Sequence, residues 1–212
     1  MFLLKDVKYK NILDIAYLEI KENKLTCIVG ESGSGKSTLL RLLNKLISCD
    51  SGEIFYKGEN LKDIDSVSLR RKVVMLSQFP SIFNGAVKDN LLIGLKFSEK
   101  DEVDDEKLRE VLRLVNLNKE LNDGVDNLSG GEKQRLALAR VILMDPEVFL
   151  LDEPSSALDE ETEEIIIEKL VAYTKGKRKI LVMVTHSKKV ADTYGENIIE
   201  IHQGKVLSCK EV

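Results

Sequence analysis

The sequence has few cysteines and no long apolar run, and both absences limit what the chain can be. Its three cysteines, Cys27, Cys49 and Cys209, are odd in number and far apart, so they form neither a disulfide framework nor a metal pattern and indicate a reducing compartment. No apolar run approaches the roughly 18 residues of a membrane span. The first residues, Met1 to Asp6, become charged too early for a signal peptide. We therefore expect a cytoplasmic chain that reaches a membrane only through a partner.

Positive charge is not in excess either. The chain has 32 lysines and arginines against 36 aspartates and glutamates, a net charge of −4. This balance does not favour a large electrostatic surface for nucleic acid, so we expect no nucleic-acid partner. Hydrophobic residues make up 43% of the sequence, enough for a sizeable core. With 212 residues and no internal repeat, low-complexity tract or interdomain linker, the sequence predicts one domain.

A glycine-rich segment between a predicted strand and a predicted helix organises the chain. It consists of Gly30, Glu31, Ser32, Gly33, Ser34, Gly35, Lys36, Ser37 and Thr38. The apolar run Leu25 to Val29 predicts a short buried strand before it, and the apolar spacing from Thr38 to Leu46 predicts a helix after it. Strand, glycine-rich turn and helix together are the context of a phosphate-binding loop.

The chemistry of this loop suits the phosphates of a nucleotide. Glycines let successive backbone N–H groups point into one concavity, and the positive end of the following helix favours the same negative charge. Lys36 adds a mobile positive charge for the terminal phosphates, and the Ser37 hydroxyl is placed to bind Mg²⁺. The alternative is a glycine-rich turn without a ligand. The combined pattern favours binding of a nucleoside triphosphate.

Three further predicted strands end in polar residues. Val73 to Ser77 leads to Gln78, Val148 to Leu151 leads to Asp152 and Glu153, and Ile180 to Thr185 leads to His186. Continuous apolar strands of this kind belong to a parallel sheet, whose carboxyl edge usually holds ligands. Two adjacent carboxylates after buried residues are costly unless a cation or a reaction uses them. Alone, Gln78 would be an ordinary loop residue and His186 a structural one.

A serine followed by two glycines opens another predicted helix, which continues to Leu143. Ser129 is a natural N-cap, and Glu132 three residues later completes a capping-box spacing. Gly130 and Gly131 leave backbone donors bare for close approach by an anion. The alternative is a well-capped helix with no further role.

The remaining segments predict an antiparallel N-terminal region and a helical insertion. Phe2 to Tyr9 and Ile15 to Ile20 predict antiparallel strands beside the nucleotide base, where Tyr9 is either a stacking partner for adenine or an ordinary strand aromatic. From Asn84 to about Arg140 the pattern is mostly helical, with a one-sided apolar stripe from Asp101 to Asn116. Apolar strands alternating with helices predict an α/β fold with a largely parallel sheet.

Taken in order, these motifs resemble those of the nucleotide-binding subunit of an ATP-binding cassette (ABC) transporter, from about Leu3 to Leu207. In that family the segment from Leu128 to Glu132 is the signature that distinguishes it from other phosphate-loop ATPases. The resemblance implies a P-loop NTPase fold with a mainly parallel central sheet, an N-terminal antiparallel β region and a helical sub-lobe. It further implies a single domain over residues 1–212, with 1–80 and 141–212 as the catalytic core and about 81–140 as the helical subdomain.

The resemblance also implies a role for each motif. Gly30 to Lys36 would hold the phosphates of ATP, and Ser37, Asp152 and Gln78 would complete the Mg²⁺ site. Glu153 would be the general base, or the polariser, of the attacking water. His186 would brace the γ-phosphate and that water. Tyr9 matches the adenine-stacking aromatic of the family only loosely, because the segment after it is short.

A partner is implied as well, since the chain has one copy of each motif. In this family Ser129, Gly130 and Gly131 complete the ATP site of the facing subunit, and Ser156 to Asp159 line the interface. The chain would therefore pair with itself or a close paralogue around two ATP–Mg²⁺. The segment from Gln78 to Asn90 would dock onto an integral membrane permease, which would hold the chain at the inner face of the cell membrane.

The leading hypothesis is thus an ATPase that drives a separate permease. The segment from Phe79 to Asn90 resembles the corresponding segment of exporters. The compact chain, with Glu132 in its signature, is similar to small bacterial ATPases that pair with a separate permease, including a metal (iron) export type. Two alternatives stay open: a soluble ABC-type clamp of the iron–sulfur assembly or DNA-repair kind, and a nucleotide-gated binding module without turnover. Repair heads carry a long coiled coil between their halves, which this sequence lacks. Glu153 and His186 argue against a module that never hydrolyses its nucleotide.

Overall fold

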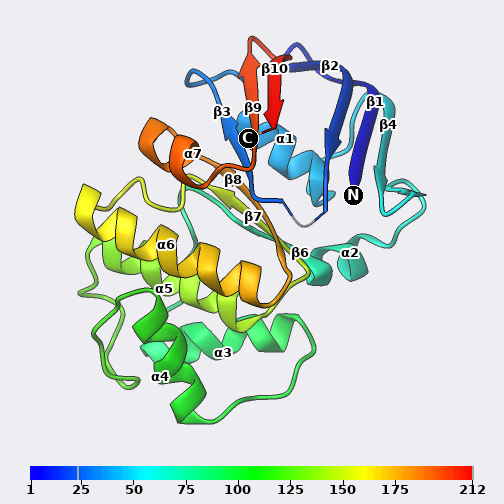
Figure 1. Ribbon diagram of the computed structural model, residues 1–212. Helices are drawn as coiled ribbons and strands as arrows, with labels where there is room; N and C mark the ends of the chain where they lie inside the picture. The colour runs from blue at the N-terminus through cyan, green and yellow to red at the C-terminus, as the bar shows by residue number, and fades with distance from the viewer. Residues whose placement is uncertain (23, 212) are drawn as a thin grey trace.

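The computed structural model describes residues 1–22 and 24–211, which form two sheets with helices around them (Figure 1). The antiparallel sheet has the order β2–β1–β4–β5, with β1 Phe2–Tyr9, β2 Leu13–Ile20, β4 Ser51–Tyr56 and β5 Glu59–Asn60. The larger sheet has the order β10–β9–β3–β8–β7–β6 and is parallel from β9 to β6. Its strands are β3 Thr26–Val29, β6 Val73–Leu76, β7 Val148–Asp152, β8 Ile180–Val184, β9 Asn197–His202 and β10 Lys205–Glu211. The predicted α/β fold, with a mainly parallel central sheet and an N-terminal antiparallel region, is confirmed.

The helices lie on both sides of the larger sheet. They are α1 Lys36–Leu43, α2 Ser66–Lys72, α3 Val87–Phe97, α4 Asp105–Leu114, α5 Gly130–Leu143, α6 Glu160–Gly176 and α7 Lys188–Tyr194. Helices α3 and α4 both pack on α5, at the end of the molecule away from the antiparallel sheet (Figure 1). This cluster occupies the segment predicted to be mostly helical. Helix α5 continues past residue 140, and the division into a core and a helical subdomain stays a prediction; residues 23 and 212 lie outside the described chain.

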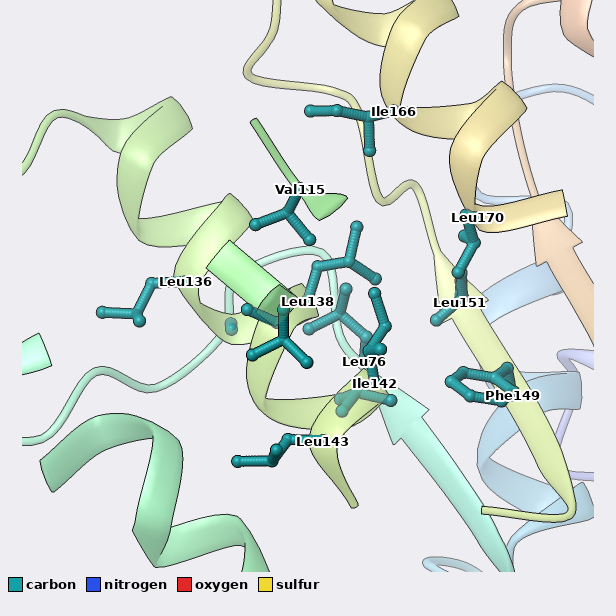
Figure 2. Packing of buried hydrophobic residues seen from close by; sticks show 14 of the residues in the cluster. Leu76, Val115, Leu136, Leu138, Ile142, Leu143, Phe149, Leu151, Ile166 and Leu170 are labelled. Atoms are coloured by element: carbon teal, nitrogen blue, oxygen red, sulfur yellow. The ribbon is translucent and has the colours of Figure 1, made fainter. Parts of the chain in front are cut away.

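The alternation of side chains along the parallel strands divides the interior into two cores. Successive residues of a strand point to opposite faces of the sheet. Phe149 and Leu151 of β7 therefore pack with α5 and α6, whereas Val148 and Leu150 pack with α1 and the antiparallel sheet. Figure 2 shows the first core, in which Leu138 and Ile142 of α5 point toward Leu76 of β6, and Leu170 of α6 lies near Leu151 of β7. A strand buried on both faces needs a continuous apolar run, which explains the sequence of β7.

Helix α1 joins the two sheets. Its residues Leu39, Leu40, Leu42 and Leu43 are each at most 1% exposed and belong to the core that includes both sheets. The helix begins at Lys36 and ends at Leu43, three residues before the predicted end at Leu46. Tight packing of α1 matters for function, because the glycine-rich segment is held between this helix and β3.

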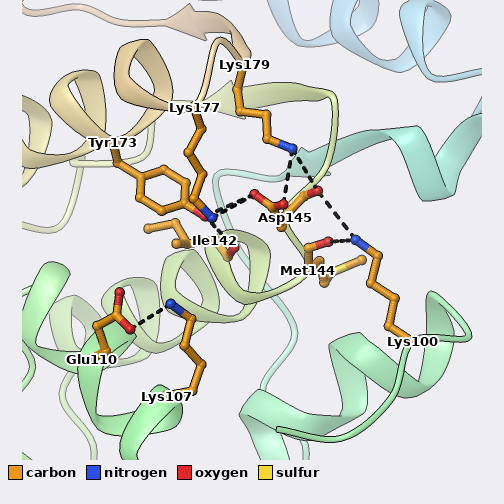
Figure 3. A network of polar contacts seen from close by, with 9 residues as sticks. All are labelled: Lys100, Lys107, Glu110, Ile142, Met144, Asp145, Tyr173, Lys177 and Lys179. Atoms are coloured by element: carbon orange, nitrogen blue, oxygen red, sulfur yellow. Dashed lines mark hydrogen bonds and ion pairs between the residues drawn. The ribbon is translucent and has the colours of Figure 1, made fainter.

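A polar network fixes the end of α5 against α6 and β8 (Figure 3). The Asp145 carboxylate accepts a hydrogen bond from the Tyr173 hydroxyl at 3.1 Å and pairs with Lys179 at 3.2 Å and Lys177 at 3.5 Å. Burial favours the neutral form of Asp145, but the pairing with Lys179 and Lys177 outweighs it and lowers the pKa of the carboxyl. The network therefore holds α5, the helix that begins at the signature segment and is called the signature helix below, to α6 and β8 most firmly when Asp145 is charged.

We expect Asp145→Asn to cost about 1 kcal/mol in the free energy of unfolding at neutral pH, because half-exposed ion pairs are weakened by water. A carboxyl with a depressed pKa stabilises the fold above its ordinary value near 4 and loses that contribution as the pH falls further. The gap between the wild type and the variant in urea unfolding should therefore close below about pH 4. An equal gap at pH 7 and pH 3 would show that charge is not the cause.

Candidate phosphate-binding site

The glycine-rich segment forms a turn that only glycine allows at several positions. Gly30, Gly33 and Gly35 have φ values of 144°, 77° and 105°, in the region that side chains rarely adopt. A Cβ on Gly30 would lie 2.1 Å from the carbonyl oxygen of Ile201, so the strand β9 also excludes a side chain there. Gly35 is the N-cap of α1 and offers no side chain to its first amides. Those N–H groups are therefore available to an anion, as the sequence predicts.

Lys36 folds back over this turn. Its Nζ donates to the carbonyl oxygens of Gly30 at 2.9 Å and Glu31 at 2.7 Å, and the residue is 5% exposed. Burial lowers the pKa of Lys36, while the carboxylates of Glu153 and Asp152 favour its charged form. The ammonium is thus held against the backbone of the loop, where it can also meet a phosphate oxygen.

Ser37 and Asp152 come together on the other side of the loop. Ser37 Oγ donates to Asp152 Oδ1 at 3.0 Å, although the two residues are 115 positions apart. Asp152 is 2% exposed, and burial is the main reason that its pKa is raised. A buried carboxylate beside a hydroxyl is a donor set of hard oxygens, which Mg²⁺ prefers, and a cation there would offset the cost of burying the charge. These residues fit the predicted metal.

Glu153 receives one contact from each neighbouring strand end. Gln78, after β6, donates from Nε2 to Glu153 Oε2 at 2.7 Å, and His186 Nε2, after β8, lies 2.8 Å from Glu153 Oε1. The strands β6, β7 and β8 are adjacent and parallel, so their carboxyl ends meet at one edge. Glu153 has a φ of 50°, a left-handed conformation that turns its side chain out of the strand direction.

A cavity of about 530 Å³ joins these groups. It is lined by Ile12, Ser32, Gly33, Gly35, Lys36, Ser37, Thr38, Gln78, Glu153 and His186. Ile12 was not expected: it follows β1, is 40% exposed, and carried no signal except an apolar side chain at a hairpin tip. Tyr9 is partly buried against the core of the antiparallel sheet and is not among the lining residues. Its stacking on a base stays a prediction.

The serine and two glycines of the signature segment lie outside this cavity. Ser129 caps α5, with Glu132 N donating to its Oγ at 3.3 Å and its own N–H donating to Glu132 Oε2 at 2.8 Å, so the predicted capping box is present. Ser129 and Gly130 are exposed. Asp159 caps α6 by accepting from Thr162 N at 2.9 Å, and its part in nucleotide binding stays a prediction. One chain therefore does not bring the signature to its own phosphate loop.

Gln134 connects helix α5 to the backbone around Glu153, and no sequence motif predicted this role. It is 2% exposed; its Nε2 donates to the carbonyl oxygen of Glu153 at 2.9 Å, and its Oε1 accepts from Ala157 N at 3.1 Å. The available signal was a polar residue on the inward face of α5, four positions before Leu138. These bonds tie the backbone of Glu153 to the signature helix.

Comparisons with known proteins agree with this geometry. The family model described as "ABC transporter" matches residues 13–156, more than half of the chain. The methionine import ATP-binding protein MetN of Clostridium tetani is 38% identical over 95% of the chain and 65% of its own length. Protein STAR1 of Oryza sativa subsp. japonica is 37% identical over 95% of the chain and 58% of its length. The chain therefore spans less than two thirds of the length of these relatives.

A solved structure resembles the whole fold. It is the dimeric, post-hydrolysis state of an ATP-binding cassette bound to ADP and Pi, with a TM-score of 0.89 and 32% identity over 100% of this chain and 98% of that one. The match includes the sheet edge that carries the phosphate loop and Glu153. From the motif geometry, the family model and this likeness, the chain belongs to the ABC transporter family, and its fold is that of an ATP-binding cassette.

Proposed function

We propose that this chain binds ATP with Mg²⁺ and hydrolyses it as the ATP-binding subunit of an ABC transporter. The observation that carries the proposal is the position of Glu153. Its carboxylate is held by Gln78 and His186 in the cavity that Lys36 and Ser37 also line. A carboxylate that lines the same cavity as a phosphate loop suits an attacking water, which a site for binding alone does not need.

Each residue of the site has a separate role in the proposed hydrolysis of ATP. The loop amides and Lys36 bind the phosphates, which fixes the terminal phosphorus relative to the sheet edge. Glu153 accepts a hydrogen bond from the water and then its proton, while the donors on Gln78 and His186 keep the carboxylate aimed at the cavity. Ser37 and Asp152 would hold Mg²⁺. When bound, the metal neutralises charge on the phosphate oxygens.

The proposal includes a second copy of the chain or a close paralogue. Gly130 and Gly131 occupy the first two positions of α5, whose N–H groups have no partner within the helix. A Cβ on Gly130 would meet nothing within 4 Å in its own chain, so packing in the monomer does not require glycine there. An anion held by a facing chain would use both the donors and the space. The similar solved cassette is dimeric, which supports this arrangement.

Ser129→Arg tests the shared site. We expect the variant to bind ATP as a monomer with wild-type affinity, because the phosphate loop is untouched, but to lose ATP-dependent dimerisation. The bulky cation would occupy the space in front of Gly130, and the loss of the cap costs roughly 1 kcal/mol of stability. Sedimentation velocity with and without ATP measures association, and nucleotide titration measures binding. A variant that still dimerises with ATP would contradict the shared site.

We further propose that the segment from Gln78 to Asn90 docks onto a membrane permease. Phe79 is 86% exposed, and Phe97 at the end of α3 is 60% exposed and packs edge-on against Phe83. Large exposed aromatics of this kind often mark an interaction surface. Within the described residues no helix has the length and apolar character to cross a bilayer. The relatives include names for import and for transport/processing, so the exporter and metal-export expectation stays a prediction.

A further inference from the structure

An ion pair joins the first turn of α5, called here the signature turn (Ser129 to Glu132), to a lysine outside every motif. Lys119, in the segment between α4 and α5, places its Nζ 2.9 Å from Glu132 Oε1. The other carboxylate oxygen, Oε2, accepts from the backbone N–H of Ser129 at 2.8 Å. The side chains of Lys119 and Glu132 are 29% and 21% exposed, so both are partly shielded from water. Each oxygen of the carboxylate is thus held by a donor.

The negative charge of Glu132 lies close to the N–H groups that would bind a phosphate in the proposed function. Glu132 is in the first turn of α5, beside the N–H groups of Gly130 and Gly131 that would receive a phosphate. Pairing with Lys119 and the bond from Ser129 lower the pKa of Glu132 to about 2, so it is charged at neutral pH. An unpaired negative charge in that turn would stabilise the helix but repel an arriving anion. The pairing with Lys119 cancels that charge locally.

We propose that Lys119 is a positioning residue for the shared nucleotide site: it neutralises Glu132 and holds it in the capping box, so that the turn at Gly130 and Gly131 accepts a phosphate bound to a second copy of the chain. The inference rests on the proposed function, because it concerns the encounter between the signature turn and the facing nucleotide. It adds a residue, Lys119, that no motif contains. The contact with the phosphate itself belongs to the backbone donors.

Ordinary surface pairing is the other explanation for the contact, and the two differ in what they predict. A surface ion pair contributes little to stability, so under either explanation Lys119→Met should shift the melting temperature by no more than about 2 °C. Under the proposal the same variant weakens ATP-dependent dimerisation, and it does so only while residue 132 is charged. The neutral isostere Glu132→Gln keeps an oxygen for the Ser129 N–H and removes the charge.

The experiment is a double-mutant cycle in full-length chains that all carry Glu153→Gln to slow hydrolysis. Sedimentation velocity with Mg²⁺ and ATP gives the dimer dissociation constant for the parent, Lys119→Met, Glu132→Gln and the combined variant. We expect Lys119→Met to weaken the dimer about tenfold, since a dimer has two such turns and each unpaired charge costs about threefold. In the Glu132→Gln background the same change should alter the constant by less than about twofold.

Three controls sharpen the result. Lys119→Arg restores the charge and should dimerise like the parent, whereas Lys107→Met removes an exposed pair with Glu110 on α4 and should have no effect. Added salt should reduce the penalty of Lys119→Met, because it screens the uncovered carboxylate. A dimer unaffected by Lys119→Met, or one weakened equally in the Glu132→Gln background, would overturn the inference while leaving the proposed function intact. A parent chain that never dimerises with ATP would overturn both.

Discussion

Replacing Glu153 with glutamine is expected to lower steady-state ATP hydrolysis by about 10³-fold, within the range usual for loss of a general base. Glutamine has nearly the same shape and can still accept a hydrogen bond, but it cannot take a proton from water. Lys36, Ser37 and the loop amides are untouched, so ATP binding should persist at close to wild-type affinity. Phosphate release measures turnover, and titration with a fluorescent ATP analogue measures binding.

A matched control for this change is Glu160→Gln in the first turn of α6. Glu160 is seven positions further along the chain, and its side chain is 80% exposed, paired only with Lys189 at 3.6 Å among the described residues. The control should hydrolyse ATP at the wild-type rate, which would show that the loss belongs to the carboxylate beside Gln78 and His186. Hydrolysis by Glu153→Gln at a rate within a few fold of the wild type would contradict the assignment of Glu153 as the general base.

Replacing Lys36 with alanine is expected to weaken ATP binding by about 10- to 150-fold, because charge-assisted hydrogen bonds of this kind are worth about 1.5–3 kcal/mol. The Nζ of Lys36 already lies within hydrogen-bond distance of two loop carbonyls, so it needs little rearrangement to meet a phosphate. Isothermal titration with ATP and Mg²⁺ measures the loss.

Lys57→Ala is the matched control for Lys36→Ala. Lys57 pairs with Glu147 at 2.6 Å, far from the phosphate loop in sequence and absent from the cavity. Circular dichroism and melting should show that both variants stay folded. Unchanged affinity for ATP in the Lys36→Ala variant would contradict the assignment of residues 30–37 as the phosphate-binding loop.

The parallel sheet and the core of the site could be predicted because both follow from simple patterns. A strand buried on both faces requires a continuous apolar run, and the carboxyl ends of parallel neighbours share one edge. These two facts predict that Gln78, Glu153 and His186 lie at one edge of the sheet, and the resemblance to the ABC family predicted that they share one site. The capping box of Ser129 and Glu132 was equally local, since it depends on a spacing of three residues.

The parts that were not predicted depend on long-range contacts or on short elements. Helix α2 has Leu69 as its buried residue, and α7 has Val190 and Ala191, which is too little to give an apolar stripe. Strand β5 is two residues long, which is too short to show an alternating pattern. Ile12 lines the cavity because the turn between β1 and β2 packs against Gly35 of the phosphate loop. Gln134 meets Glu153 because α5 packs beside β7, and no local pattern encodes that contact.

The two halves of the proposed site are the phosphate loop, with Lys36 and Glu153, and the signature turn at Ser129. Within one chain the cavity includes the first half and excludes the second. The first backbone N–H groups of α5 and the open space beside Gly130 would bind a phosphate of the nucleotide held by a second chain. Association of two chains around ATP therefore completes the proposed site, and turnover depends on it.

The most direct test is to count chains and nucleotides in one particle. Purified Glu153→Gln protein, incubated with Mg²⁺ and ATP, should elute from a size-exclusion column with the mass of a dimer, as measured by light scattering. Nucleotide extracted from that peak should amount to two ATP for every two chains. Without nucleotide the same protein should be monomeric. A monomer carrying one ATP at every protein concentration, or a dimer that forms equally well without nucleotide, would contradict the account.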